Sequence, residues 1–186
     1  MPTPDQKEAL EDALSGTLSR TIEFLKFAET KNAALLTFAS AWSLALVNLL
    51  ISSRFTQEGP RTAVAVCLLL FAVAALVALY SFLPRLRLSS FHSGSKQQSS
   101  LIYFGDIARF DADSYGSSFS TRYASDPEQV ISDNYLNDLA VQVAANSSIT
   151  NRKYNLFYVG ATLVIFAVLG LVGTAAWMTY FNLWTK

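Results

Sequence analysis

The residue types that most often do chemistry in proteins are scarce in this chain. One histidine, His92, and one cysteine, Cys67, stand among 186 residues. Cys67 lies inside an apolar run, so we expect a small core side chain and neither a disulfide nor a metal ligand. His92 lies in a serine-rich stretch, which predicts a solvated side chain. The usual residues of nucleophilic and metal-dependent mechanisms are therefore missing, as is a glycine-rich phosphate loop.

Carboxylates are the remaining candidates for catalysis. Asp111 and Asp113 form the sequence Asp-Ala-Asp, and close carboxylates of this kind occur in hydrolases and at magnesium sites. No second acidic cluster accompanies them, so the pattern favours a solvated turn or a helix start. We predict a protein that is not an enzyme and that uses neither a cofactor nor a metal.

The segment 99–115, SSLIYFGDIARFDADSY, combines four aromatic residues with a glycine, an arginine and three aspartates. Such a segment either packs a small soluble domain or holds a ligand. Gly105 is expected to turn a short extended piece into a helix that Asp106 caps. The spacing of Tyr115, Phe119 and Tyr123 predicts one aromatic helical face.

The elements around this segment have the composition of a membrane protein. Apolar residues make up 52% of the chain and charged residues 15%, against about a quarter charged in soluble domains. Three apolar runs occupy 33–52, 63–83 and 156–181, and about twenty helical residues cross a hydrocarbon core. We predict three transmembrane helices, with 53–62 as a short external loop and 182–186 as an external tail.

Lysine and arginine predict the orientation. Eleven of them lie before the first span or between the second and third, and three lie in the short loop and the tail. By the positive-inside rule, the N-terminus and residues 84–155 are cytoplasmic and the C-terminus is outside.

The cytoplasmic parts are predicted to be mainly helical. Residues 1–32 have apolar positions at helical spacing and lead directly into the first span. A second helix, with a start signal at Ser125 to Glu128, passes without a breaker into the third span. The predicted fold class is an all-α membrane protein, with three transmembrane helices and a small cytoplasmic domain formed by stalk extensions of the first and third spans. So small a domain is expected to depend on neighbouring subunits, which favours a homo-oligomer.

Several short motifs resemble those of a known family, the membrane effectors of Pycsar, a bacterial pyrimidine-cyclase antiphage system. They occur in the family's order between matching spans, over about residues 20–180. The matching residues are Ala28, Lys31 and Ala33 before the first span, Leu83, Pro84 and Arg85 after the second, Phe104, Gly105, Ile107 and Ala108 in the middle, and Arg152, Lys153 and Tyr154 before the third.

The resemblance implies a function that composition does not show. Such effectors are bacterial inner-membrane proteins that sense a cyclic pyrimidine mononucleotide, cUMP or cCMP, made by a partner cyclase during phage infection. Binding to the cytoplasmic sensing region, residues 84–155, then impairs membrane integrity, and the infected cell stops growing or dies. Relatives in other nucleotide-signalled defence systems leave a cyclic oligonucleotide open as the ligand.

The resemblance also suggests a binding region. A cyclic nucleotide needs a stacking surface for its base and hydrogen-bond donors for one phosphate charge. Arg109 is either a ligand contact or part of a structural salt bridge, and Phe104 with Gly105 either contacts ligand or forms a packed turn. Arg152 and Lys153 are either contacts or anchors near the membrane. The full candidate set is Tyr103, Phe104, Gly105, Arg109, Phe110, Arg152 and Lys153.

A different class of function remains open from the residues alone. The chain is alternatively a structural membrane scaffold or accessory subunit that binds a protein partner through its cytoplasmic helices. No feature of the sequence points to nucleic acid, because the formal net charge is zero.

Overall fold

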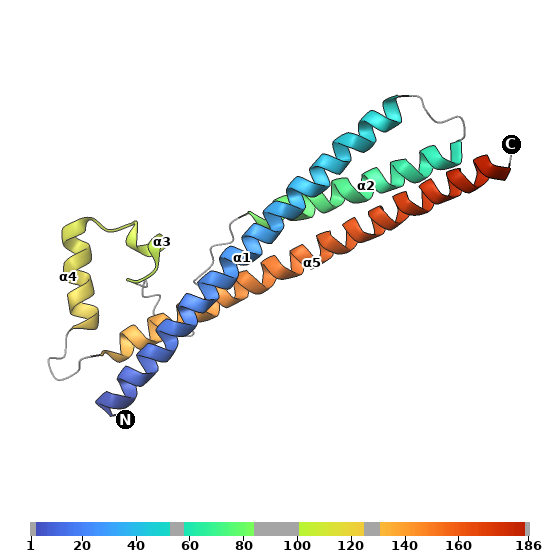
Figure 1. The fold of residues 1–186 in the computed structure, drawn as a ribbon. Helices are drawn as coiled ribbons and strands as arrows, with labels where there is room; N and C mark the ends of the chain where they lie inside the picture. Colours follow the sequence, from blue (N-terminus) through green and yellow to red (C-terminus); the bar gives the residue numbers. More distant parts are fainter. Residues whose placement is uncertain (1–2, 53–57, 84–100, 125–130, 185–186) are drawn as a thin grey trace, which may run out of the picture. The chain divides into compact units, whose positions relative to one another are not determined.

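The computed structural model describes residues 3–52, 58–83, 101–124 and 131–184. The serine-rich stretch with His92 and the helix start predicted at Ser125 to Glu128 lie outside these ranges. The chain order is α1 (Pro4–Ile51), α2 (Glu58–Ser81), α3 (Phe104–Ile107), α4 (Ala112–Tyr123) and α5 (Asp133–Trp184) (Figure 1). Helices hold 91% of the described residues, which contain no strand, so the all-α prediction is confirmed.

The helices divide into two compact units. Unit 1 comprises residues 1–25 and 85–150, and unit 2 comprises residues 26–84 and 151–186. Two helices belong to both: α1 runs through 48 residues and α5 through 52 without interruption. At about 1.5 Å per residue each is more than twice as long as a hydrocarbon core is thick.

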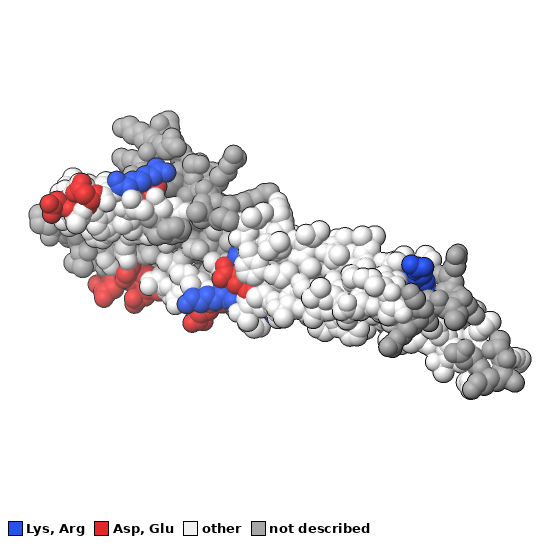
Figure 2. All heavy atoms as spheres, turned by 90° about the horizontal axis from the view of Figure 1, so that it is seen from above, with Lys and Arg blue, Asp and Glu red and all other residues white. Residues whose placement is uncertain are grey.

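Within the described ranges, three helices are long and apolar enough to cross a membrane. Their most apolar windows, in α1, α2 and α5, have mean hydropathies of 1.9, 2.8 and 2.4. This confirms the prediction of three spans. Figure 2 shows a long stretch without Lys, Arg, Asp or Glu along unit 2.

The core of unit 2 is built from small and aromatic side chains of α1, α2 and α5. Trp42 of α1 stacks on Phe71 of α2 at 5.8 Å between ring centroids, and Phe71 is fully buried. Cys67 is 3% exposed in the same cluster, beside Ala39 and Ala167. The predicted role of Cys67 as a small core side chain is thereby confirmed.

Two glycines of α5 allow close helix packing in unit 2. A Cβ on Gly160 would lie 2.6 Å from Cδ2 of Leu35 and 3.6 Å from the carbonyl oxygen of Ala74. A Cβ on Gly170 would lie 2.8 Å from the sulfur of Cys67. Small residues at such positions let membrane helices approach one another.

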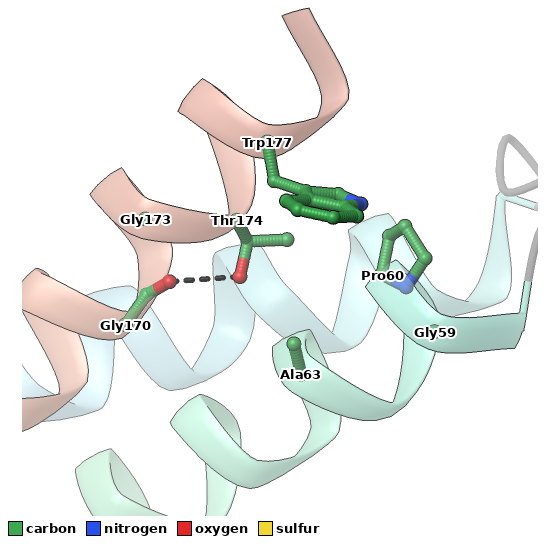
Figure 3. Close-up of a pocket in the computed structure, with 7 residues that line it drawn as sticks. All are labelled: Gly59, Pro60, Ala63, Gly170, Gly173, Thr174 and Trp177. Atoms are coloured by element: carbon green, nitrogen blue, oxygen red, sulfur yellow. Dashed lines mark hydrogen bonds between the residues drawn. The ribbon is translucent and has the colours of Figure 1, made fainter. Parts of the chain in front are cut away.

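The packing opens near the beginning of α2. Gly170, Gly173, Thr174 and Trp177 of α5 line an open cavity of about 410 Å³, together with Gly59, Pro60 and Ala63 of α2 (Figure 3). Nothing lies within 4 Å of a Cβ placed on Gly173. The Thr174 hydroxyl donates to the carbonyl of Gly170 at 2.7 Å, so it is satisfied within its own helix.

Unit 1 packs the first half of α1 and the start of α5 with α3 and α4. Its buried apolar side chains include Leu101, Tyr123, Leu136, Leu139 and Ala145. At the beginning of α5 the Ser132 hydroxyl accepts from the N–H of Tyr135 at 3.2 Å. The Lys7 ammonium of α1 pairs with Asp133 at 2.8 Å.

The two glycines Gly160 and Gly173 provide a matched test of this packing. Gly160→Ala should destabilise the protein by about 1 kcal/mol or more, because the buried Leu35 side chain must shift to admit the methyl group. Gly173→Ala should stay within about 0.5 kcal/mol of the parent, because its methyl group enters open space. Thermal unfolding in one detergent measures both, and equal effects would contradict the close approach at Gly160.

Candidate ligand-binding region

The described residues 101–124, between the second and third spans, contain two short helices, of which α4 has a well-defined start. Asp111 is the N-cap of α4, and its carboxylate accepts from the backbone N–H of Ser114 at 2.9 Å. This hydrogen bond holds the pKa of Asp111 below its usual value. The helix-start interpretation of the Asp-Ala-Asp sequence is thus confirmed. The expected cap at Asp106 was wrong, because α3 begins two residues earlier, at Phe104.

An aromatic ladder runs along α4 and onto α5. Its neighbouring ring centroids lie 4.7 to 6.3 Å apart, in tilted or edge-to-face arrangements. Residues four apart share one face of a helix, so the predicted aromatic face is confirmed. The ladder consists of Phe110, Tyr115, Phe119, Tyr123 and Tyr135.

A buried ion pair fastens α4 to α5. The Asp138 side chain is fully buried and accepts from Nη2 of Arg122 at 3.0 Å and 2.9 Å, through its two oxygens. The Tyr123 hydroxyl also donates to Asp138. Burial raises the pKa of Tyr123, and the neighbouring carboxylate raises it further. This clamp is structural, because Asp138 has no access to solvent.

Sequence reasoning missed the clamp, although a signal for it existed. Asp138 lies between Leu136 and Leu139, both of which are buried. A carboxylate on the apolar face of a helix needs a buried partner. Arg122 is the only lysine or arginine of α4, and it stands in the last turn of that helix.

Side chains of α4 and α5 hydrogen-bond to the backbone of residues 101 and 102. The Tyr115 hydroxyl donates to the carbonyl of Leu101 at 3.0 Å, and the Gln142 amide of α5 donates to the carbonyl of Ile102. The ring of Tyr103 lies over Gly105, where a Cβ would be 2.7 Å from ring atom Cε1. Gly105 thus lies within α3 under the Tyr103 ring, and its contact with a ligand stays a prediction.

The predicted site residues fall into the two units. Tyr103, Gly105 and Phe110 are half-buried in unit 1, and Arg109 beside them is exposed. The structural salt bridge considered for Arg109 is not among the ion pairs of the described residues. Phe104 begins α3, and its side chain lies outside the described part.

Arg152 and Lys153 lie in unit 2 and cross-link helices there. The Lys153 ammonium is 2.8 Å from the Glu29 carboxylate of α1. The Arg152 guanidinium carbon lies 5.1 Å from the ring centroid of Tyr80 on α2. Both cations belong to a different compact unit from Tyr103 and Arg109.

Comparison with known proteins agrees with this architecture. Residues 13–180 match the Pycsar effector protein domain, PycTM. The chain belongs to the PycTM family of Pycsar effectors. It is similar to the Pycsar effector protein RsPycTM of a Rhizobium species, with 36% identity over 154 residues, which cover 83% of this chain and 87% of the relative. No solved structure matches the chain.

The family confirms the resemblance that the short motifs suggested. PycTM membership identifies an antiphage defence effector with candidate membrane-spanning helices, and the matched family is one of effectors.

The clamp of this PycTM protein predicts a large difference between two aspartates of α5. Asp138→Ala should destabilise the protein by about 3 kcal/mol or more, because it leaves the Arg122 charge and the Tyr123 hydroxyl without their buried acceptor. Asp133→Ala should cost less than about 1 kcal/mol, because Asp133 is 75% exposed at its side chain. Thermal unfolding of both variants checks this, and similar losses would show that the clamp is not important for stability.

The cap of α4 predicts a pH dependence. Because the pKa of Asp111 is lowered by folding, its contribution is present above the unfolded pKa of about 3.9 and is lost as pH falls through the folded pKa. Asp111→Asn keeps an acceptor that does not titrate. The melting temperature of the wild type relative to this variant should therefore fall as pH is lowered from neutral to about 3. A constant difference over that range would contradict the role of the charged cap.

Proposed function

We propose that this PycTM protein is a bacterial inner-membrane effector that binds cUMP or cCMP in its cytoplasmic unit 1 and then impairs membrane integrity. A nucleotide cyclase would supply the ligand during phage infection, and the infected cell would stop growing or die. The observation that carries the proposal is that α1 and α5 each run unbroken from unit 1 into the membrane spans of unit 2.

The proposed orientation follows from charge. Unit 1 and the segments next to it hold most of the lysines and arginines, which the positive-inside rule assigns to the cytoplasm. A nucleotide made by a cytoplasmic cyclase then meets unit 1 directly. The C-terminus of α5, with Trp177, Tyr180 and Trp184, faces the opposite interface, where such aromatic residues are enriched.

The binding region is proposed at residues 103–110 of unit 1. Tyr103 and Phe110 offer aromatic rings for a base, and the exposed Arg109 guanidinium offers charged donors for the phosphate. The backbone around this region is held by Tyr115 and Gln142, so a ligand meets a positioned surface and not a free loop.

The proposed mechanism is a shift between two arrangements of the helices. A ligand shifts such an equilibrium only as far as it binds the active arrangement better than the resting one. Rearrangement of α4 against the stalk parts of α1 and α5 would be passed on by those helices themselves, because no linker interrupts them. A homo-oligomer would combine this change over several copies.

Calorimetric titration of the detergent-solubilised protein tests the ligand. We expect saturable binding of cUMP or cCMP, with cAMP, cGMP and cyclic dinucleotides as comparisons. Arg109→Ala should weaken binding about tenfold or more, since a charge-assisted hydrogen bond to the phosphate is lost. Arg20→Ala, which removes an exposed arginine of α1 in the same unit, is the control and should leave affinity unchanged.

Dye release from liposomes that carry the protein tests the effect. Addition of the bound nucleotide should release the dye, whereas liposomes that stay sealed at saturation would overturn the membrane part of the proposal. Binding only of a dinucleotide would overturn the pyrimidine part. A folded protein that binds no nucleotide and co-purifies with a fixed protein partner would support the scaffold function instead.

A further inference from the structure

Three helices of unit 2 meet at a group of polar side chains that we call the polar joint: Glu29 and Asn32 of α1, Ser81 of α2, and Arg152 and Lys153 of α5. The Lys153 ammonium pairs with Glu29 at 2.8 Å. The Asn32 side chain donates from Nδ2 to the carbonyl of Lys153 at 3.1 Å and to that of Ala28 at 2.9 Å. These contacts tie α1 to α5.

The end of α2 is held at the same level by two cations of α5. The Arg152 guanidinium lies over the ring of Tyr80 at 5.1 Å, and the Lys153 ammonium lies over the ring of Phe82 at 5.7 Å. Ser81, which stands between these two rings in the chain, is 1% exposed. Because α2 has no basic residue in its own last turn, these cations also supply positive charge near its C-terminal carbonyls.

Three polar atoms of the joint are buried without a hydrogen bond. They are Oδ1 of Asn32, Oγ of Ser81 and Nη2 of Arg152, and none has a partner among the described residues. Asn32 itself is fully buried. Its amide cannot be turned to satisfy Oδ1, because both nearby main-chain groups are carbonyls that require the Nδ2 donor.

Unsatisfied buried polar atoms are rare, because burying a polar atom without a partner is costly. One each from α1, α2 and α5 come together here, next to an apolar core. Leu35, one turn after Asn32 along α1, already packs closely on Gly160 of α5. The polar joint thus lies next to the point along α1 and α5 where the apolar packing of the spans begins.

We propose that the polar joint is the place where water first enters between the spans when the effector is activated. In the resting arrangement, the ion pair of Glu29 with Lys153 and the stacking of Arg152 on Tyr80 keep the three helices together. Separation of α2 from α5 admits water, which hydrogen-bonds to the three unsatisfied atoms and so favours the open arrangement. This inference rests on the proposed membrane effect and adds the site where it starts.

Two opposite changes in leakage are expected. Lys153→Met keeps much of the side-chain volume but removes the ion pair, so it should raise dye release without nucleotide about tenfold or more. Glu29→Lys combined with Lys153→Glu should return that release toward the wild-type level. Ser81→Ala removes an atom that water would satisfy, so it should lower nucleotide-triggered release about tenfold while the affinity measured by calorimetry stays unchanged.

The chain offers a matched control for Ser81. Ser43 lies in the first span, and its hydroxyl donates to the carbonyl of Ala39 at 2.8 Å, so it is already satisfied. Ser43→Ala should leave both triggered and untriggered release unchanged. If Ser81→Ala behaves like Ser43→Ala, or if Lys153→Met stays as tight as the wild type, the inference is wrong.

Water access can be measured without relying on leakage. In a Cys67→Ala background, Ser81→Cys places one thiol at the joint and Ser43→Cys places one in the span. Nucleotide should speed the reaction of the thiol at position 81 with a charged methanethiosulfonate reagent about tenfold or more, and should leave the reaction at position 43 unchanged. An unchanged rate at 81, in a protein that binds nucleotide and leaks, overturns the inference while the proposed function stands. A wild-type protein that neither binds nor leaks overturns both.

Discussion

The structure depends on one constraint, the need of every backbone N–H and C=O in a hydrocarbon core to find its partner within the protein. An unbroken α-helix meets this requirement inside a single segment. Three stretches of this chain are apolar enough to exploit it, and no proline or glycine pair interrupts α1 or α5 where they leave those stretches. Because nothing interrupts α1 and α5 where they leave the apolar stretches, both helices continue beyond the length needed to cross the membrane.

Ion pairs connect the helices within each unit. In unit 1 the Arg122 and Asp138 pair joins α4 to α5, and in unit 2 the Glu29 and Lys153 pair joins α1 to α5. The two pairs differ in burial. Both oxygens of the wholly buried Asp138 accept hydrogen bonds, whereas three atoms of the polar joint have no hydrogen-bond partner among the described residues. A buried polar atom without a partner is costly, so a state in which water reaches the joint recovers that cost.

This difference between the two sites suits the proposed function, in which the spans stay packed until a nucleotide binds. PycTM membership identifies a defence effector, and the membrane effect proposed for it requires a resting state that is stable but not irreversible. Glycines such as Gly160 let the spans pack closely. The polar joint, by contrast, contains buried atoms that have no hydrogen-bond partner among the described residues. The proposed binding region lies in the other unit, from which α1 and α5 run unbroken into the spans.

Five features could be predicted from the amino-acid sequence: the all-α class, the three apolar spans, the core position of Cys67, the aromatic face of α4 and the family. Each of these depends on local periodicity, composition or motif order, which adjacent residues carry. Three contacts became visible only in the packed helices: the Arg122 and Asp138 clamp, the approach of Leu35 to Gly160, and the meeting of Glu29, Asn32 and Ser81 with Arg152 and Lys153. These depend on pairs of residues that are up to 124 positions apart. Helical periodicity shows which side chains share a face, but not which face of another helix they meet, because that choice is made only when the helices pack.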